Sequence, residues 1–214
     1  MANSQAMTMF TNMIDGYRRF RANGWMTQHE RWTTLADGQS PRVMVIACCD
    51  SRVDPATIFD ASPGEMFVVR NIANLVPPFE TSPGHHGVSA ALEFAVTQLE
   101  VEEIVVMGHG QCGGIAAAMS QRFADAAPGE GGFIASWIHM LDDARDRVIH
   151  EHGCDATHEL ELEAIKTSIA NLRTFACIRE REQAGKLELH GAWFSIDAGK
   201  LHVLDPETGE FAPA

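Results

Sequence analysis

Short apolar runs alternate with stretches of helical periodicity along this chain, and this alternation most constrains its fold. Residues 43–48, 65–71 and 103–110 form three such runs, and residues 190–204 predict two more strands around a turn at 198–199. Continuous apolar runs of this length are typical of strands buried on both faces of a parallel sheet. The pattern therefore predicts an α/β fold with a mainly parallel central sheet flanked by helices.

Apolar residues spaced three and four apart predict the helices between these strands. The predicted helices cover residues 4–22, 32–35, 86–99, 113–123, 131–151 and 157–183. A turn rich in helix-breaking residues at 36–41 separates the first two helices from the rest. We therefore expect a single domain with a helical N-terminal arm (1–37), an α/β core (38–205) and a loose tail (206–214).

Composition and charge exclude several classes of partner. The formal net charge of −13 argues against binding to nucleic acid, which needs clustered Lys and Arg. Neither a long apolar run nor a signal-peptide pattern is visible, so we expect a cytoplasmic protein with no membrane partner. In a reducing compartment, five cysteines favour metal binding or catalysis over a disulfide framework.

Candidate metal ligands end two of the predicted strands. Cys48 ends the first strand and His109 the third, and Cys112 follows three residues later in a glycine-rich turn. The carboxyl ends of parallel strands meet at one edge of a sheet, where ligands bind in such folds. Two thiolates and one imidazole suit Zn²⁺, and three protein ligands leave the fourth position open, as in catalytic zinc sites.

Strand alternation helps to choose between the adjacent cysteines. If the extended backbone continues, Cys48, Asp50 and Arg52 point in one direction and Cys49 in the other. This spacing favours Cys48 as the ligand, beside a carboxylate and a guanidinium, and predicts Cys49 to be a buried neighbour.

From about Gly38 to Leu204 the sequence resembles the β-class carbonic anhydrases of the plant-type and bacterial branch. The resemblance is carried by "ACCDSRVDP", "GEMFVVRNIANLVPP", "ALEFAVTQLEVEEIVVMGHGQCGG" and "NLRTF". It implies reversible hydration of CO₂ to bicarbonate and a proton, through attack by zinc-bound hydroxide, with one Zn²⁺ per chain. It also implies a homodimer or dimer-based tetramer whose subunits share the active site, with CO₂ and bicarbonate as the small-molecule partners.

The resemblance assigns roles to residues by position. Asp50 and Arg52 would be the catalytic pair, with Asp50 orienting the hydroxide and Arg52 keeping Asp50 ionised and in place. The implied zinc ligands are Cys48, His109 and Cys112, and the implied substrate pocket is Gln39, Phe67, Ile72, Phe94 and Gly113.

One branch of the family is inhibited by bicarbonate at a side site built from Trp, Arg and Tyr. This chain has Val45 and Phe94 at the Trp and Tyr positions and keeps only Arg70. We therefore predict that it lacks this side site.

Three alternatives remain open from the residues. "GQCGG" also fits the nucleophile elbow of an α/β hydrolase, with Cys112 as the nucleophile. A non-enzymatic zinc protein would need a fourth ligand, for which Asp50 is the candidate. A few members of the resembled family hydrolyse CS₂ or related molecules instead of CO₂.

Overall fold

The computed structural model describes residues 8–214, and contacts divide the chain into two units that meet after Gln39. The first unit contains α1 (Met9–Ala22), α2 (Gly24–Thr27) and α3 (His29–Ala36). The first four residues of the predicted helix 4–22 lie outside the described residues. An edge-on contact between Phe20 and Trp32, with ring centroids 5.9 Å apart, joins α1 to α3.

The apolar face of α1 is uncovered within the first unit. Phe10 is 69% exposed and Tyr17 is 59% exposed. The Thr8 side chain caps the helix by accepting the N–H of Thr11.

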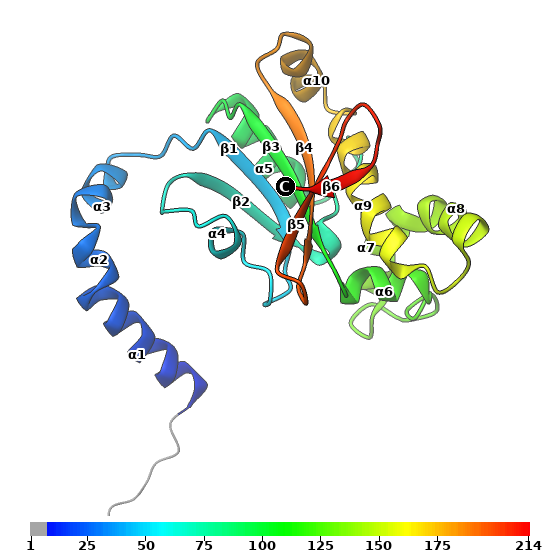
Figure 1. The fold of residues 1–214 in the computed structure, drawn as a ribbon, viewed down its shortest axis with the longest axis horizontal. Helices are drawn as coiled ribbons and strands as arrows, with labels where there is room; N and C mark the ends of the chain where they lie inside the picture. The colour runs from blue at the N-terminus through cyan, green and yellow to red at the C-terminus, as the bar shows by residue number, and fades with distance from the viewer. Residues whose placement is uncertain (1–7) are drawn as a thin grey trace, which may run out of the picture. The chain divides into compact units, whose positions relative to one another are not determined.

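The second unit is built on a six-stranded sheet with the order β2-β1-β3-β4-β5-β6, which confirms the predicted fold class (Figure 1). The strands are β1 (Val43–Cys48), β2 (Met66–Asn71), β3 (Glu103–His109), β4 (Glu188–Ser195), β5 (Lys200–Leu204) and β6 (Phe211–Pro213). The pairs β1–β2, β1–β3 and β3–β4 are parallel, whereas β5 and β6 add antiparallel strands.

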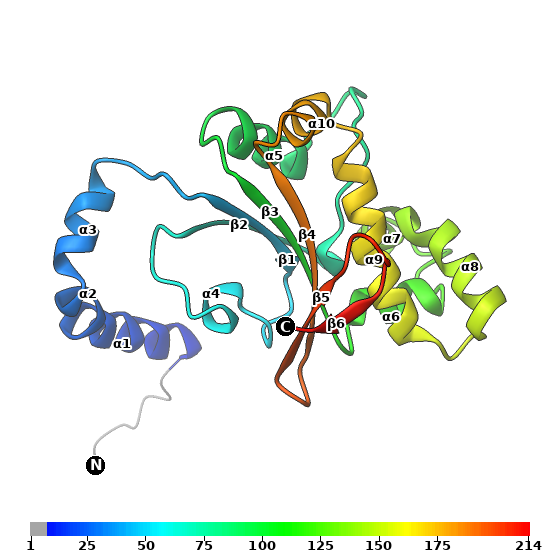
Figure 2. The same ribbon diagram turned by 45° about the horizontal axis from the view of Figure 1, so that its top comes forward.

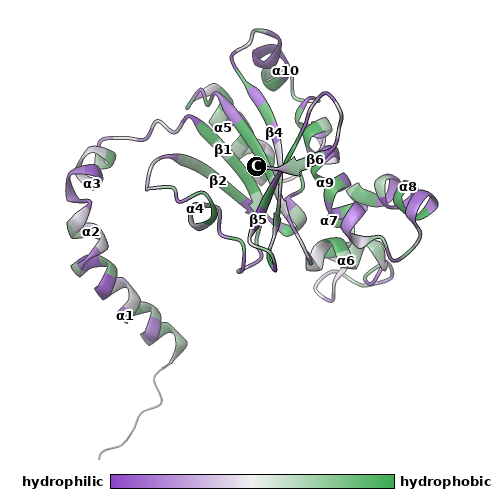
Figure 3. Ribbon diagram, viewed as in Figure 1, coloured by the Kyte–Doolittle hydropathy of each residue, from purple (hydrophilic) through white to green (hydrophobic). Residues whose placement is uncertain are grey.

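Alternation along β1 separates the two faces of the sheet. Met44 and Ile46 join the larger core, which also contains buried residues of α5 (Gly87–Thr97), α9 (Thr157–Leu172) and α10 (Ala176–Gln183). Val45 and Ala47 face the other side, where Ile58 of α4 (Pro55–Ile58) and the adjacent Phe59 are among the residues that pack against them. Figure 2 shows these helices around the sheet, and Figure 3 shows the hydrophobic character of the central strands.

A further group of helices follows β3 at the carboxyl edge of the sheet. It consists of α6 (Gly113–Met119), α7 (Gly132–Ile138), η2 (His139–Leu141) and α8 (Asp142–His152), which pack with the N-terminal half of α9 around a second core. None of the helices in residues 8–214 combines the length and apolar character needed to cross a bilayer.

Several predicted boundaries were wrong. Helix 113–123 ends at Met119, because Gln121 takes a left-handed conformation with φ of 49°. Helix 131–151 is divided by the tighter turn η2, and helix 157–183 is divided at residues 173–175. There the hydroxyl of Thr174 donates to the carbonyl of Asn171, which satisfies the helix end and allows the chain to turn.

The predicted loose tail was also wrong. Residues 211–213 form β6, and backbone hydrogen bonding between Asp205 and Glu210 closes the turn that precedes it. The predicted hairpin around Ala198 and Gly199 is confirmed, because β4 and β5 pair on either side of it.

Candidate metal centre

Parallel register brings the ends of β1 and β3 to the same edge of the sheet. Ala47 pairs with Met107, so Cys48 and His109 follow within two residues of the last ladder positions. Cys112 is the residue that precedes α6, after Gln111 has turned the chain through a left-handed conformation with φ of 57°. The three candidate ligands therefore come from two strand ends and one helix start.

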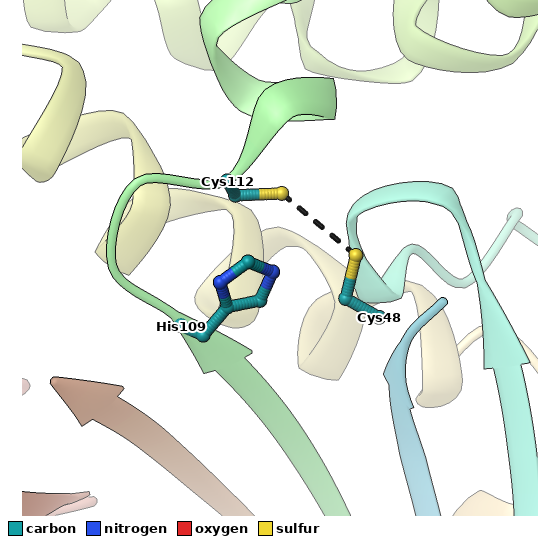
Figure 4. A group of neighbouring side chains, drawn as sticks. All are labelled: Cys48, His109 and Cys112. Atoms are coloured by element: carbon teal, nitrogen blue, oxygen red, sulfur yellow. Dashed lines mark hydrogen bonds between the residues drawn. The ribbon is translucent and has the colours of Figure 1, made fainter. Parts of the chain in front are cut away.

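The three side chains point toward a common centre (Figure 4). Their ligand atoms all lie within 4.8 Å of one another, and the two sulfurs are 3.9 Å apart. Tetrahedral zinc with Zn–S bonds of about 2.3 Å would place two sulfurs about 3.8 Å apart. Cys48, His109 and Cys112 are 5%, 1% and 1% exposed. The donor set and its spacing fit Zn²⁺.

The imidazole of His109 is prepared to be a ligand. Its Nδ1 lies 2.9 Å from the carbonyl oxygen of Gly110, which can only accept, so the proton resides on Nδ1. The Nε2 atom is then an acceptor, and it is buried without a hydrogen-bond partner. A buried lone pair without a partner is costly, and a metal ion satisfies it.

The electrostatics of the thiols agree with a cation site. Without a cation, the hydrogen bond that Cys112 donates lowers the pKa of Cys48. The same contact and burial raise the pKa of Cys112, because a second thiolate would face the first. Burial opposes an imidazolium, but contacts with Cys48 and Gly110 outweigh it and raise the pKa of His109. A divalent cation would relieve the repulsion between two thiolates.

Asp50 lies beside the ligands and is held by Arg52. The guanidinium donates from Nε to Oδ1 at 2.9 Å and from Nη2 to Oδ2 at 2.7 Å. These bonds hold the pKa of Asp50 well below its usual range, although burial opposes them. Asp50 Oδ2 is 4.0 Å from His109 Nε2, and Arg52 Nη2 also donates to the carbonyl of Gln111. The pair thus links both ligand-bearing segments.

Arg70 holds the loop that follows β1 through several hydrogen bonds. It donates to the backbone carbonyls of Cys48, Asp50 and Val53 and also contacts the carboxylate of Asp54. The guanidinium is therefore committed to the loop that carries the first ligand and the carboxylate.

Cys49 does not occupy the buried position that the sequence predicts. It is exposed, because the chain leaves the sheet directly after Cys48, and the Cys49 N–H bonds to the carbonyl of Asn71. Both Cys48 and Cys49 border a cavity of about 330 Å³. The complete lining is Cys48, Cys49, Asp50, Ile72, Gly113, Gly114, Ala117, Phe123 and Ile134.

Only part of the predicted substrate pocket lines this cavity. Ile72 and Gly113 do, whereas Phe67 and Phe94 pack against each other, with ring centroids 5.9 Å apart, and are absent from its lining. Gln39 is exposed at the end of the first unit. The roles of Gln39, Phe67 and Phe94 therefore stay predictions.

Sequence reasoning missed the apolar wall of this cavity, which comes from the group of helices that follows β3. Phe123 and Ile134 come from a segment without strand or ligand motif, so no local signal marked them. Ile72 is held in place by Trp137, whose indole N–H donates to the Ile72 carbonyl at 2.8 Å. Gly114 allows close packing here, since a Cβ would lie 2.8 Å from Ile72 Cγ2.

A Cys–His–Cys cluster at the carboxyl edge of a parallel sheet offers three metal ligands, the number that catalytic zinc sites of hydrolases and lyases use. The carbonic anhydrase family model matches residues 43–201, which includes all three ligands. The chain belongs to this family, in its β class, whose members catalyse the reversible hydration of CO₂.

Individual relatives agree over nearly the whole chain. A carbonic anhydrase of Pseudomonas aeruginosa is 37% identical over 203 residues, covering 94% of this chain and 90% of the relative. Beta carbonic anhydrase 3 of Arabidopsis thaliana is 37% identical, covering 95% and 80%. Among solved structures, the β-carbonic anhydrase CcaA superposes with a TM-score of 0.88 at 30% identity, covering 97% and 100%. A tetrameric β-carbonic anhydrase of Sordaria macrospora gives 0.78 at 30%, covering 91% and 96%.

Proposed function

We propose that this chain is a zinc-dependent carbonic anhydrase in which Cys48, His109 and Cys112 hold one Zn²⁺. The observation that carries the proposal is the clamped carboxylate of Asp50, 4.0 Å from the Nε2 of His109 and on the wall of the same cavity. When bound, zinc lowers the pKa of a coordinated water and supplies a hydroxide nucleophile near neutral pH.

The chain's own residues would then position the reactants. Asp50 is an acceptor throughout the usual pH range, because Arg52 holds its pKa low. It can accept the O–H of the attacking water and so aim the oxygen lone pair at CO₂. Ile72, Phe123 and Ile134 provide an apolar wall suited to CO₂, which carries no net dipole. Addition of water to CO₂ yields bicarbonate and one proton, which passes to buffer.

The geometry favours this reaction over the alternatives drawn from the residues. A Cys112 nucleophile would need an accessible sulfur, but this residue is 1% exposed and its sulfur contacts that of Cys48. Asp50 as a fourth ligand would have to leave Arg52, which bonds both of its carboxylate oxygens. The apolar wall does not by itself separate CO₂ from CS₂.

The test compares Asp50→Asn with wild type by zinc content and stopped-flow CO₂ hydration. We expect about one zinc per chain in both, and a loss of about 10²–10⁴-fold in hydration rate for the variant. Asp60→Asn is the matched control, because Asp60 is exposed and its left-handed conformation (φ 47°) suits Asn. Unchanged hydration in Asp50→Asn would refute the assigned role, and metal-free ester hydrolysis would favour a Cys112 nucleophile.

We further propose a homodimer or dimer-based tetramer, located in the cytoplasm. Support comes from the tetrameric relatives and from exposed apolar side chains on β2 and α5, where Val68 is 39% and Phe94 is 44% exposed. Five free cysteines suit a reducing compartment. Analytical ultracentrifugation tests the assembly, and fractionation of cells tests the location.

A further inference from the structure

One buried acidic side chain contacts the metal centre from an element that carries no ligand. Glu161 on α9 is 4% exposed. Its Oε1 accepts the backbone N–H of Cys112 at 3.1 Å, and its Oε2 accepts the indole N–H of Trp193 at 3.0 Å. We propose that Glu161 is a positioning residue that holds the Cys112 backbone, and with it the Gly110–Gly113 turn, in metal-binding geometry. The inference rests on the proposed function.

Close packing of α9 against the sheet brings Glu161 to this place. Ile165, four residues later on the same helix face, lies against Gly108 and Gly191, where a Cβ would approach its atoms to 2.8 and 2.9 Å. These two glycines lie on β3 and β4 and allow the helix backbone to come near. One turn earlier, the side chain of Glu161 therefore reaches the turn that follows β3.

The surroundings of Glu161 show why the carboxylate is retained in a buried position. A buried carboxylate is costly unless its oxygens accept hydrogen bonds. The carboxylate meets two N–H donors and the Nδ1 of His158 at 3.4 Å, and the His158 ring packs edge-on against Trp193 at 4.7 Å. An apolar side chain in its place would leave the N–H groups of Cys112 and Trp193 without an acceptor in the protein interior.

The position of Cys112 indicates what its hydrogen bond with Glu161 does. Cys112 is both a candidate ligand and the residue before α6, and its own side chain makes no capping hydrogen bond there. Holding its N–H fixes the backbone from which the Cys112 sulfur projects toward Cys48. Residues that orient metal ligands in this way contribute about 10–100-fold to metal affinity.

Glu161→Gln is the principal variant, because it preserves shape. The amide has one acceptor oxygen for the two N–H donors. With the oxygen toward Cys112 its NH₂ opposes the indole N–H of Trp193, and with the oxygen toward Trp193 its NH₂ opposes the Cys112 N–H, so the hold on Cys112 is weakened in either orientation. Trp193→Phe removes the opposing donor, and the amide can donate to His158 Nδ1 instead. The double variant should therefore recover part of what Glu161→Gln loses.

Zinc affinity is measured by chelator competition, and the ligand field by the absorption spectrum of the cobalt-substituted protein. We expect zinc affinity to fall about 10–100-fold in Glu161→Gln, with shifted cobalt bands, and to recover partly in the double variant. Glu163→Gln, on the same helix and paired with Lys166 at 2.8 Å, is the matched control and should leave both unchanged.

Unfolding of the metal-free proteins separates positioning from a purely structural role. The inference would be overturned if Glu161→Gln kept the zinc affinity and the cobalt spectrum of the wild-type protein, whether or not the variant lost stability. Because Glu161→Gln nearly preserves shape, it decides the question even if Glu161→Ala fails to fold. Zinc binding without CO₂ hydration in wild type would instead refute the proposed function and leave the positioning role standing.

Discussion

Substituting Ala for Gly108 should disturb the contact between β3 and α9 on which the metal centre is built. The added Cβ would lie 2.8 Å from Cδ1 and 3.0 Å from Cγ1 of Ile165, and real Cβ atoms essentially never approach closer than 3.0 Å. Ile165 is fully buried in the larger core, so its side chain has little room to move. Gly108 also precedes His109 directly.

The expected cost follows from overpacking a dense core. One extra methyl group in such a place costs about 1–3 kcal/mol. For a domain of this size, that lowers the midpoint of thermal unfolding by about 2–12 °C. Gly87→Ala is the control, since a Cβ there meets no atom within 4 Å, and it should leave the midpoint unchanged or raise it slightly.

A second substitution tests the cause. Ile165→Val deletes Cδ1, the atom nearest to the new methyl group, and by itself costs about 0.5–1.5 kcal/mol. The double variant should lose less stability than the sum of the two single variants, as measured by urea unfolding at fixed zinc concentration. Strict additivity would show that the two side chains do not clash and would refute the packing argument.

Three further predictions concern the site itself. Arg52→Lys should lower CO₂ hydration by at least about tenfold with zinc content unchanged, because a lysine cannot make the bidentate contact; equal rates by stopped flow would contradict this. Bicarbonate should not inactivate the enzyme, since Arg70 donates to three backbone carbonyls; bicarbonate-dependent inactivation with the anion bound beside Arg70 would overturn this. Iodoacetamide should modify Cys49 in the zinc-loaded protein and reach Cys48 and Cys112 only after chelation, as peptide mass spectrometry can check.

Local pattern was sufficient for the fold class and for bringing the candidate ligands together. Apolar runs that end at Cys48 and His109 predict parallel strands, and parallel strands end at the same edge. Cys112 is close to His109 in sequence, so only one long-range contact had to be inferred. Asp50 lies close to the ligand His109, but alternation does not separate it from Cys49, because Cys48, Cys49 and Asp50 all line the same cavity.

Predictions from local sequence patterns were wrong where contacts with residues distant in sequence decide the structure. The exposure of Cys49 depends on where the chain leaves the sheet, and the end of α9 lies beside Phe79, whose backbone N–H donates to the hydroxyl of Thr174. Residues 211–213 form a strand because they pair with the edge strand β5. None of these partners is visible within a short sequence window.

The sequence by itself therefore determined the chemistry of the site: which side chains carry sulfur, imidazole and carboxylate, and at which strand ends they occur. Only the tertiary structure decided what surrounds them, namely the wall formed by Phe123 and Ile134 and the contact of Glu161 with the ligand turn. The physical reason is that hydrophobic periodicity reports which face of an element is buried, whereas it does not report against which other element that face is packed.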